Sequence, residues 1–257
     1  MLRPAPSTVP RWVIGALAGA CLGLGYWSCV GKDTGSTEQQ GTASAAGAHQ
    51  QARQQMVREQ LQGRDIHHQG VLAAMGRVPR HRFVPASLRQ RAYNALPLPI
   101  GHDQTISQPY IVAFMTQALE LEGDEKILEI GTGSGYQAAI LGQLAREVFT
   151  IEIVDPLAKR AQKLLAEMGY ENVHVRSGDG YRGWPEEAPF DAIMVTAAPD
   201  HVPQPLIDQL RVGGRMILPV GSFFQDLVLI QKTAKGIIKR SVLPVRFVPM
   251  TGEARKR

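Results

Sequence analysis

The stretch that decides the fold is Glu129-Ile130-Gly131-Thr132-Gly133-Ser134-Gly135-Tyr136. It closes the short apolar run 126–130, which predicts a strand, and leads into residues 136–145, whose apolar side chains predict a helix. A strand, a glycine turn and a helix make half of a βαβ unit. In sheets built from such units, ligands bind beyond the carboxyl ends of the strands, so this turn is the first place to expect a site.

The rest of the chain continues the alternation. Further strands are predicted at residues 148–153, 173–176, 190–196 and 215–220, and helices at 156–168 and 203–210. After residue 221 only strands are predicted, at 227–231, 236–240 and 245–248, so the sheet should finish with a hairpin. Continuous apolar strands separated by helices are typical of a parallel sheet covered on both faces. We therefore predict an α/β fold with a doubly wound, mostly parallel sheet and helices on both faces.

Composition excludes several classes of function. The chain has 257 residues, 44% of them hydrophobic, enough for one sizeable domain with an appendage. Its formal charge of +5 is spread along the chain, and the dense basic cluster at 255–257 is typical of a solvated tail, so we expect no nucleic-acid partner. Both cysteines, Cys21 and Cys29, precede Val30, which excludes a zinc-cysteine site or a cysteine nucleophile from the main body. The histidines form no ligand pair at helical spacing, so no metal is expected.

The first thirty residues look like a targeting segment. No charge occurs between Arg11 and Lys32, and the apolar run follows a basic amino terminus. This layout is typical of a secretory signal or of an N-terminal membrane anchor. We assign residues 1–30 to such a segment, with membrane contact through residues 12–30. Four alternatives stay open for this segment: it is cleaved off, it stays as a permanent anchor, it is lipidated at one of the two cysteines, or it does not act in targeting.

A linker is predicted next. Residues 31–48 are rich in Gly, Ser, Thr, Gln and Ala and contain almost nothing apolar to bury. Such a composition predicts a flexible connection rather than a packed element. The folded domain should therefore cover residues 49–257 and begin with helices at 50–62 and 70–75.

The glycine turn distinguishes between cofactor classes. Its pattern lacks the third glycine of the dinucleotide fingerprint, which would fall at Tyr136, and no Gly-Lys-Ser/Thr of a nucleoside-triphosphate loop is present. An acid at the strand end followed by Gly-x-Gly-x-Gly resembles the motif of class I S-adenosylmethionine-dependent methyltransferases, and this resemblance implies a seven-stranded, Rossmann-like sheet. Glycines let the backbone approach the methionine part of such a cofactor, and Glu129 would receive its ammonium group directly or through water. The cofactor-binding residues expected here are Glu129, Gly131, Thr132, Gly133, Ser134 and Gly135.

Two further acids stand where this superfamily would have them. Glu152 ends the second strand, a position from which a carboxylate accepts the hydroxyls of a ribose. Asp179, followed by Gly180, closes the third strand and would face the adenine edge. Each acid alone is more often a turn or cap residue. Acids at three successive strand ends favour a cofactor site.

The acceptor class follows from a second resemblance. Residues 194–199 lack the Asn- or Asp-Pro-Pro-Tyr of amino-group methyltransferases that act on nucleic-acid bases. Upstream, Gln104-Thr105-Ile106-Ser107-Gln108-Pro109 resembles the protein-L-isoaspartate O-methyltransferase family, and the likeness runs from Gln55 to Thr251. It also includes Val78-Pro79-Arg80, Phe83-Val84-Pro85 and Gly213-Gly214-Arg215. His102-Asp103 is a small departure from the family pattern.

The resemblance implies transfer of a methyl group from S-adenosylmethionine to the free carboxylate of L-isoaspartyl (or D-aspartyl) residues in damaged proteins, which starts their repair. It implies Ser107 as the catalytic residue, whose hydroxyl would orient the acceptor; the other role for this serine is to cap a helix beginning at Pro109. It further implies that Thr251 contacts the cofactor from a C-terminal segment folded over it. The residues expected to line the substrate cleft are Thr105, Ile106, Val195, Thr196, Ala197 and Ala198.

Other functions and two locations stay open. A class I methyltransferase for another carboxylate or a small-molecule acceptor is the nearest alternative, and a cofactor-binding envelope protein without catalysis is a more distant one. Isoaspartyl proteins and peptides are the expected partners, and we expect a monomer. The basic residues before the apolar segment predict a domain in the bacterial envelope, whereas the family and its cofactor predict the cytoplasm.

Overall fold

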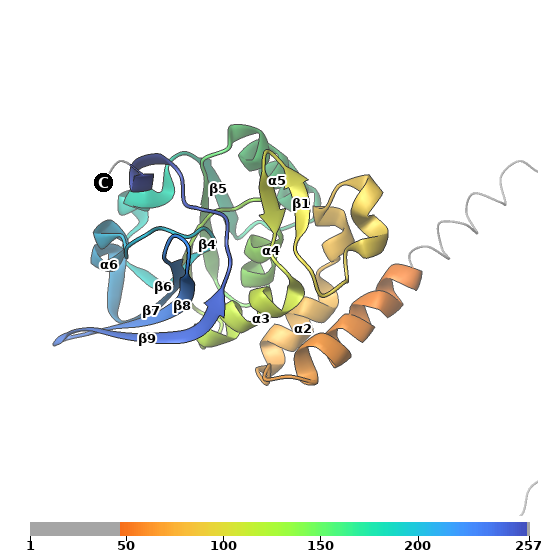
Figure 1. The fold of residues 1–257 in the computed structure, drawn as a ribbon, viewed down its shortest axis with the longest axis horizontal. Helices are drawn as coiled ribbons and strands as arrows, with labels where there is room; N and C mark the ends of the chain where they lie inside the picture. The colour runs from red at the N-terminus through yellow and green to blue at the C-terminus, as the bar shows by residue number, and fades with distance from the viewer. Residues whose placement is uncertain (1–46, 256–257) are drawn as a thin grey trace, which may run out of the picture. The chain divides into compact units, whose positions relative to one another are not determined.

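The computed structural model describes residues 47–255 (Figure 1). The predicted targeting segment and residues 31–46 of the predicted linker lie outside this range, while residues 47 and 48 already belong to a helix. Within residues 47–255, no helix has the length and apolar character needed to cross a bilayer.

One large sheet organises the fold. Its strands are β3 (Lys126–Ile130), β4 (Glu147–Glu152), β5 (Val173–Ser177), β6 (Phe190–Val195), β7 (Leu210–Val220), β8 (Gln225–Thr233) and β9 (Gly236–Val245). They lie in the order β5-β4-β3-β6-β7-β8-β9 (Figure 1). The pairs from β5 to β7 are parallel, and β8 and β9 add an antiparallel hairpin. The predicted seven-stranded, mostly parallel sheet is therefore confirmed. The chain leaves β3 in one direction and returns on its other side as β6, which makes this the switch point where ligands bind.

Helices cover both faces of the sheet. They are α2 (Gln69–Arg77), α3 (Pro109–Ala118), α4 (Tyr136–Gly142), α5 (Asp155–Glu167) and α6 (Gln204–Gln209), with short helical turns η1 (Val57–Gln62), η2 (Arg80–Phe83), η3 (Ala86–Arg91), η4 (Gly180–Arg182), η5 (Pro185–Glu187) and η6 (Gly252–Arg255). Residues 47–56 are also helical. Because side chains alternate along a strand, Ile127 packs with α3 and α4, whereas Leu128 packs on the opposite face with α6. A third group of buried side chains joins α4 and α5 to the N-terminal helices.

One predicted strand is wrong. Residues 236–240 and 245–248 were expected to be two strands, but β9 runs without a break to Val245 and the chain then leaves the sheet. The polar sequence Lys239-Arg240-Ser241 interrupted the apolar pattern. In the structure β9 is an edge strand whose side chains are mostly exposed, so polar residues fit within it.

A small hairpin was not predicted. It consists of β1 (Leu98–Gly101) and β2 (Gln104–Ile106), paired antiparallel. The turn between them is made by His102 and Asp103, whose φ angles are 54° and 57°. A two-residue hairpin turn of type I′ needs positive φ at both central positions, and the absence of glycine there hid the signal. The hairpin ends directly before Ser107.

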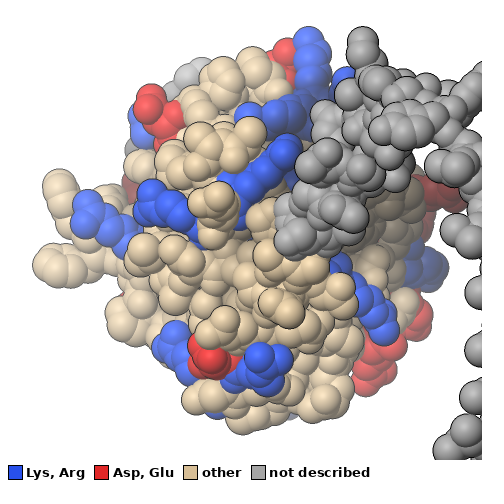
Figure 2. Space-filling model, turned by 90° about the vertical axis from the view of Figure 1, so that its right-hand side faces the viewer, with Lys and Arg blue, Asp and Glu red and all other residues tan. Residues whose placement is uncertain are grey.

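Charge gathers unevenly on the face seen in Figure 2. Lys and Arg side chains form a band across the upper part of this face, with Asp and Glu at its edges. Some of the basic groups on the surface are paired: Arg82 and Lys163 each lie 3.9 Å from a carboxylate oxygen of Glu167.

Candidate functional site

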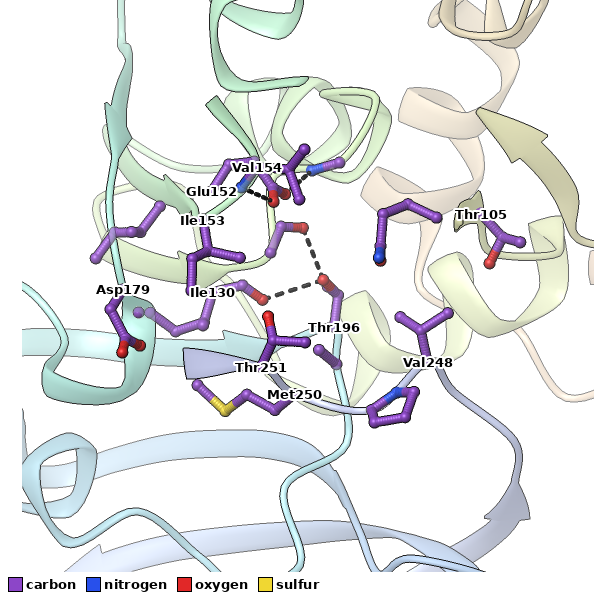
Figure 3. A pocket seen from close by; sticks show the side chains of 17 residues that line it. Thr105, Ile130, Glu152, Ile153, Val154, Asp179, Thr196, Val248, Met250 and Thr251 are labelled. Carbon is purple, nitrogen blue, oxygen red and sulfur yellow. Dashed lines mark hydrogen bonds between the residues drawn. The ribbon is translucent and has the colours of Figure 1, made fainter. Parts of the chain in front are cut away.

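Three adjoining cavities open at the carboxyl ends of the parallel strands. The first, which we call the glycine-turn cleft, encloses about 600 Å³ counted to its mouth and is bounded by the ends of β3 to β6 and by residues 248–251 (Figure 3). An inner cavity lies over α3 and α4, and an outer cavity lies beside residues 244–248; with the open solvent at their mouths included, they hold about 420 and 1010 Å³ of empty space. Thr105 and Thr196 line all three cavities. The cavities therefore meet around these two threonines.

The glycine turn has a backbone that other residues rarely adopt. Gly131, Gly133 and Gly135 have φ angles of 98°, 54° and 87°. A Cβ atom on Gly131 would lie 2.4 Å from Oγ1 of Thr196, so this position also requires glycine for space. Gly131 and Gly133 line the glycine-turn cleft, whereas Gly135 packs against α5 and lines none of the three cavities.

Glu152 holds this turn from the end of β4. Its Oε2 accepts a hydrogen bond from the amide of Gly133 (2.7 Å), and its Oε1 accepts one from the amide of Val154 (2.9 Å; Figure 3). The side chain is only 5% exposed yet lines the cleft. A carboxylate can accept about four hydrogen bonds, so each oxygen can still accept a ligand's hydroxyl.

Glu129 lies below the turn rather than in the cleft. It is fully buried, and its Oε2 accepts a hydrogen bond from the hydroxyl of Thr150 (2.6 Å). The Thr150 oxygen is also 2.7 Å from the hydroxyl of Thr132, so a chain of hydrogen bonds links the acid to the glycine turn. Burial raises the pKa of Glu129 to about 8. Its Oε1 has no hydrogen-bond partner among the residues that the structure describes.

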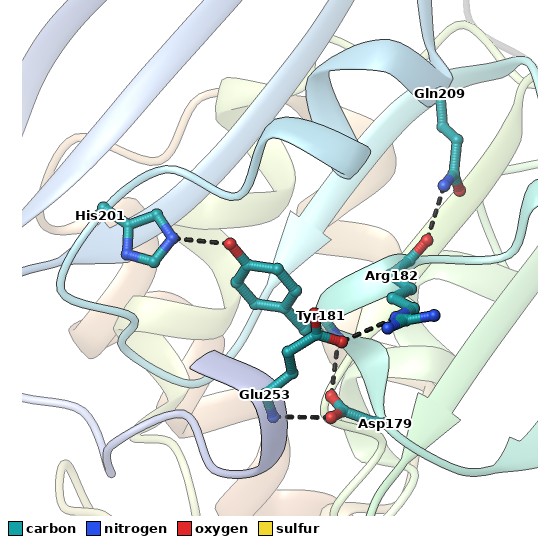
Figure 4. A network of polar contacts seen from close by, with 6 residues as sticks. All are labelled: Asp179, Tyr181, Arg182, His201, Gln209 and Glu253. Atoms are coloured by element: carbon teal, nitrogen blue, oxygen red, sulfur yellow. Dashed lines mark hydrogen bonds and ion pairs between the residues drawn. The ribbon is translucent and has the colours of Figure 1, made fainter. Parts of the chain in front are cut away.

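Asp179 joins the end of β5 to the C-terminus. Its Oδ1 accepts from the amide of Tyr181 (2.9 Å), which caps η4, and its Oδ2 accepts from the amide of Glu253 (2.7 Å; Figure 4). Glu253 in turn pairs with Arg182 at 2.7 Å. These contacts hold residues 248–251 over the cleft, where Thr251 and the Asp179 side chain both line the wall. The acid therefore acts as a helix cap and also reaches the candidate site.

Ser107 lies between the inner and outer cavities and lines both. The helix α3 begins at Pro109 as expected, but Gln108 occupies its N-cap position and no side chain caps it. The capping role that could have explained Ser107 is therefore not seen. The serine is half-buried at a place where a bound molecule could reach its hydroxyl.

The remaining predicted residues divide into two groups. Those that line at least one cavity are Thr105, Ile106, Thr132, Ser134, Gly180, Thr196 and Ala197. Val195 and Ala198 are buried and line none of the three. The backbone of Ala198 nevertheless bonds to the C-terminal segment: its amide donates to the carbonyl of Val248 (2.9 Å), and its carbonyl accepts from the amide of Met250 (2.8 Å).

Arg80 is a residue whose place in the site was not foreseen. Its side chain is fully buried, and it donates from Nε to the carbonyl of Ala92 (2.7 Å) and from Nη2 to the carbonyl of Ser107 (2.6 Å). The guanidinium carbon lies 4.9 Å from the ring centroid of Tyr136, and burial lowers the pKa of Arg80 to about 10. Within residues 47–255 no carboxylate pairs with it, and Nη1 has no partner. In the sequence Arg80 begins the basic stretch Arg80-His81-Arg82, which gives no sign of burial, so only its place in Val78-Pro79-Arg80 of the family resemblance marked it.

Comparisons with known proteins agree with this geometry. The sequence model of the family described as protein-L-isoaspartate(D-aspartate) O-methyltransferase matches residues 50–255. The protein-L-isoaspartate O-methyltransferase of Gloeobacter violaceus is 58% identical over 200 residues, which cover 77% of this chain and 98% of that protein. The one of Opitutus terrae is 57% identical over 217 residues, covering 83% and 93% of the two chains.

Solved structures show the same fold. A protein-L-isoaspartate O-methyltransferase superposes with a TM-score of 0.71 at 28% identity, covering 80% of this chain and 67% of that one. A Plasmodium falciparum structure described as a putative member of the same group, in complex with S-adenosyl-L-homocysteine, gives a TM-score of 0.68 at 24% identity, covering 77% and 98%. The resemblance found in the sequence is confirmed.

The buried Glu129 predicts an unusual dependence of stability on pH. Its pKa is about 8 in the folded chain against an ordinary value of 4.5. The unfolded chain therefore loses this proton first, and the group's contribution to the free energy of unfolding falls as pH rises from about 4.5 to about 8. Thermal melts of the ligand-free protein across this range should show a flatter profile and a higher Tm at pH 8 for Glu129→Gln. The exposed Glu171→Gln is the control; identical profiles for both variants and the wild type would contradict this assignment.

Proposed function

Because the chain belongs to the protein-L-isoaspartate(D-aspartate) O-methyltransferase family, we propose that it transfers a methyl group from S-adenosylmethionine to the free carboxylate of isoaspartyl residues in damaged proteins. The observation that carries this proposal is the meeting of the three cavities at Thr105 and Thr196. A cofactor over the glycine turn and a polypeptide in the outer cavity could approach one another there. Ser107 lies beside that junction.

The residues around the glycine-turn cleft fit such a cofactor. The backbone of Gly131 and Gly133 offers a wall without side chains, which a Cβ atom would fill. Glu129 lies below the turn and lines none of the three cavities, so its unpartnered Oε1 would accept from an ammonium group through water rather than directly. Glu152 would accept the ribose hydroxyls, and Asp179 would face the adenine edge. When bound, the cofactor supplies an electrophilic methyl group on a positively charged sulfur.

The acceptor needs little chemical activation. A carboxyl group has an ordinary pKa of about 4, so the isoaspartyl carboxylate is ionised at neutral pH and is itself the nucleophile. The site therefore has to position the carboxylate in line and remove part of its water, rather than supply a strong base. We assign the positioning to the hydroxyl of Ser107, which would donate a hydrogen bond to the carboxylate. The backbone amide nitrogen that follows would then attack the carbonyl carbon of the methyl ester and expel methanol, which takes up the amide proton, to form a succinimide whose hydrolysis returns some normal aspartate.

Two peptides that differ only in one linkage test this function. With labelled S-adenosylmethionine, label should enter the isoaspartyl peptide as a base-labile ester and should not enter the aspartyl peptide. Ser107→Ala should lower kcat/KM about tenfold to a hundredfold, because one charge-assisted donor is lost, and should leave cofactor affinity unchanged. Equal labelling of both peptides, or of neither, would point instead to another carboxylate or small-molecule acceptor.

Arg80 should act as a positioning residue through Ser107. Its side chain holds the Ser107 carbonyl at 2.6 Å and lines none of the three cavities. Arg80→Lys keeps the charge but loses the planar fork that reaches two carbonyls. We expect this variant to lower kcat about tenfold while the Kd for the cofactor, measured by calorimetry, stays within about twofold of the wild type. Arg82→Lys, at a partly exposed position beside it, is the matched control. A loss of cofactor affinity equal to the loss of kcat would show general destabilisation instead.

The N-terminal segment bears on location. We infer from its layout that residues 12–30 direct the domain to the envelope, although S-adenosylmethionine is a cytoplasmic metabolite. Full-length protein expressed in a bacterium should sediment with membranes or lack its first residues, and removal of residues 1–48 should release it. Cell fractionation with identification of the mature amino terminus measures this. An intact Met1 on cytoplasmic protein would contradict the inference and support the cytoplasmic alternative.

A further inference from the structure

Two neighbouring phenylalanines are almost entirely exposed to solvent. Phe223 is 98% exposed and Phe224 is 95% exposed, in the turn between β7 and β8. The other large apolar side chains on the described surface are exposed by 39% to 59%. Phenylalanine usually becomes buried on folding, and an adjacent exposed pair marks a binding surface more often than a single exposed residue does.

The turn that carries the pair is firmly built. Gly221 has a φ of 125°, and a Cβ atom there would overlap the carbonyl oxygen of Phe224. Its amide donates to the carbonyl of Pro199 (2.9 Å). At the other end of the turn, Oε1 of Gln225 accepts from the amide of Phe247 (2.6 Å), and its Nε2 donates to the carbonyl of the same residue (3.2 Å). The exposed pair therefore has a defined place in the fold.

The turn adjoins the outer cavity without lining it. Gln225, which directly follows Phe224, pairs in the sheet with Val245 and clamps the backbone of Phe247 through its side chain. Val245 and Phe247 line the outer cavity, whereas Phe223 and Phe224 do not. On another part of its edge, Pro97 lines the same cavity and directly follows Leu96, which is 53% exposed. The cavity that would admit the acceptor thus has exposed apolar side chains next to two of its walls.

We propose that Phe223 and Phe224 bind apolar side chains that flank the isoaspartyl residue in an extended polypeptide substrate. The inference rests on the proposed function, because the outer cavity is the entrance for the acceptor. An extended chain advances about 3.3 Å per residue, so residues a few positions from the reacting carboxylate would pass the cavity rim. Apolar side chains are accessible mainly in unfolded segments. The pair would therefore direct the enzyme to damaged sites in unfolded or partly unfolded proteins.

The test compares two isoaspartyl peptides of equal length, one with leucines and one with serines at the second to fourth positions on either side. With the full chain, kcat/KM should be about tenfold higher for the leucine peptide, as expected for partial burial of one or two large apolar side chains. The double variant F223S/F224S should remove this preference, mainly through KM, and should leave the serine peptide unchanged. The control I237S/I238S exchanges two exposed apolar residues on β9 and should keep the preference.

The outcomes separate the two proposals. If wild-type protein methylates neither isoaspartyl peptide, the proposed function fails and this inference fails with it. If it methylates both without preference, or if both double variants behave alike, only the inference is overturned.

Sedimentation with phosphatidylglycerol vesicles and analytical ultracentrifugation complete the test. Loss of vesicle binding or of self-association in F223S/F224S, with the peptide preference intact, would assign the pair to a membrane or to a second copy and overturn the proposal.

Discussion

The close approach of the glycine turn to β6 is the constraint on which the rest of the site depends. Gly131 leaves no room for a side chain beside Thr196, whose hydroxyl lies 3.0 Å from the carbonyl of Ile130 and 2.7 Å from that of Gly131. These contacts fix the spacing of the two strand ends on either side of the switch point. Glu152 fixes the next residues of the turn from β4. The cleft is thus shaped by backbone geometry, which leaves its side chains available for a ligand.

The C-terminal segment completes the cleft from a distance. Residues 248–251 contact the loop after β6 through the backbone of Ala198, and the amide of Glu253, just beyond them, bonds to Asp179 at the end of β5. Each attachment is a hydrogen bond between residues that lie more than forty positions apart in the sequence. The segment adds Met250 to the buried face under α6, so apolar packing supports those polar contacts. This wall of the cleft therefore depends on the sheet, because its hydrogen-bond partners follow strands β5 and β6.

The sequence predicted the parts that follow from local rules. Apolar runs gave the strands of the parallel sheet, and the glycine spacing located the cleft, because both depend on neighbouring residues. The hairpin turn at His102 and Asp103 escaped notice because these residues lack the usual glycine signal. The bond between Arg80 and the Ser107 carbonyl joins residues 27 positions apart. No local pattern reports such a contact, and the same is true of the clamp between Gln225 and Phe247.

Two buried ionisable groups suggest how the site is prepared for its ligands. Burial makes the ionised form of Glu129 unfavourable and lowers the pKa of Arg80, and neither group has an ion-pair partner within the described residues. Each charge would gain from an opposite one: an ammonium group near Glu129, and a carboxylate beside the Ser107 that Arg80 holds. Folding therefore carries an electrostatic cost that binding can offset.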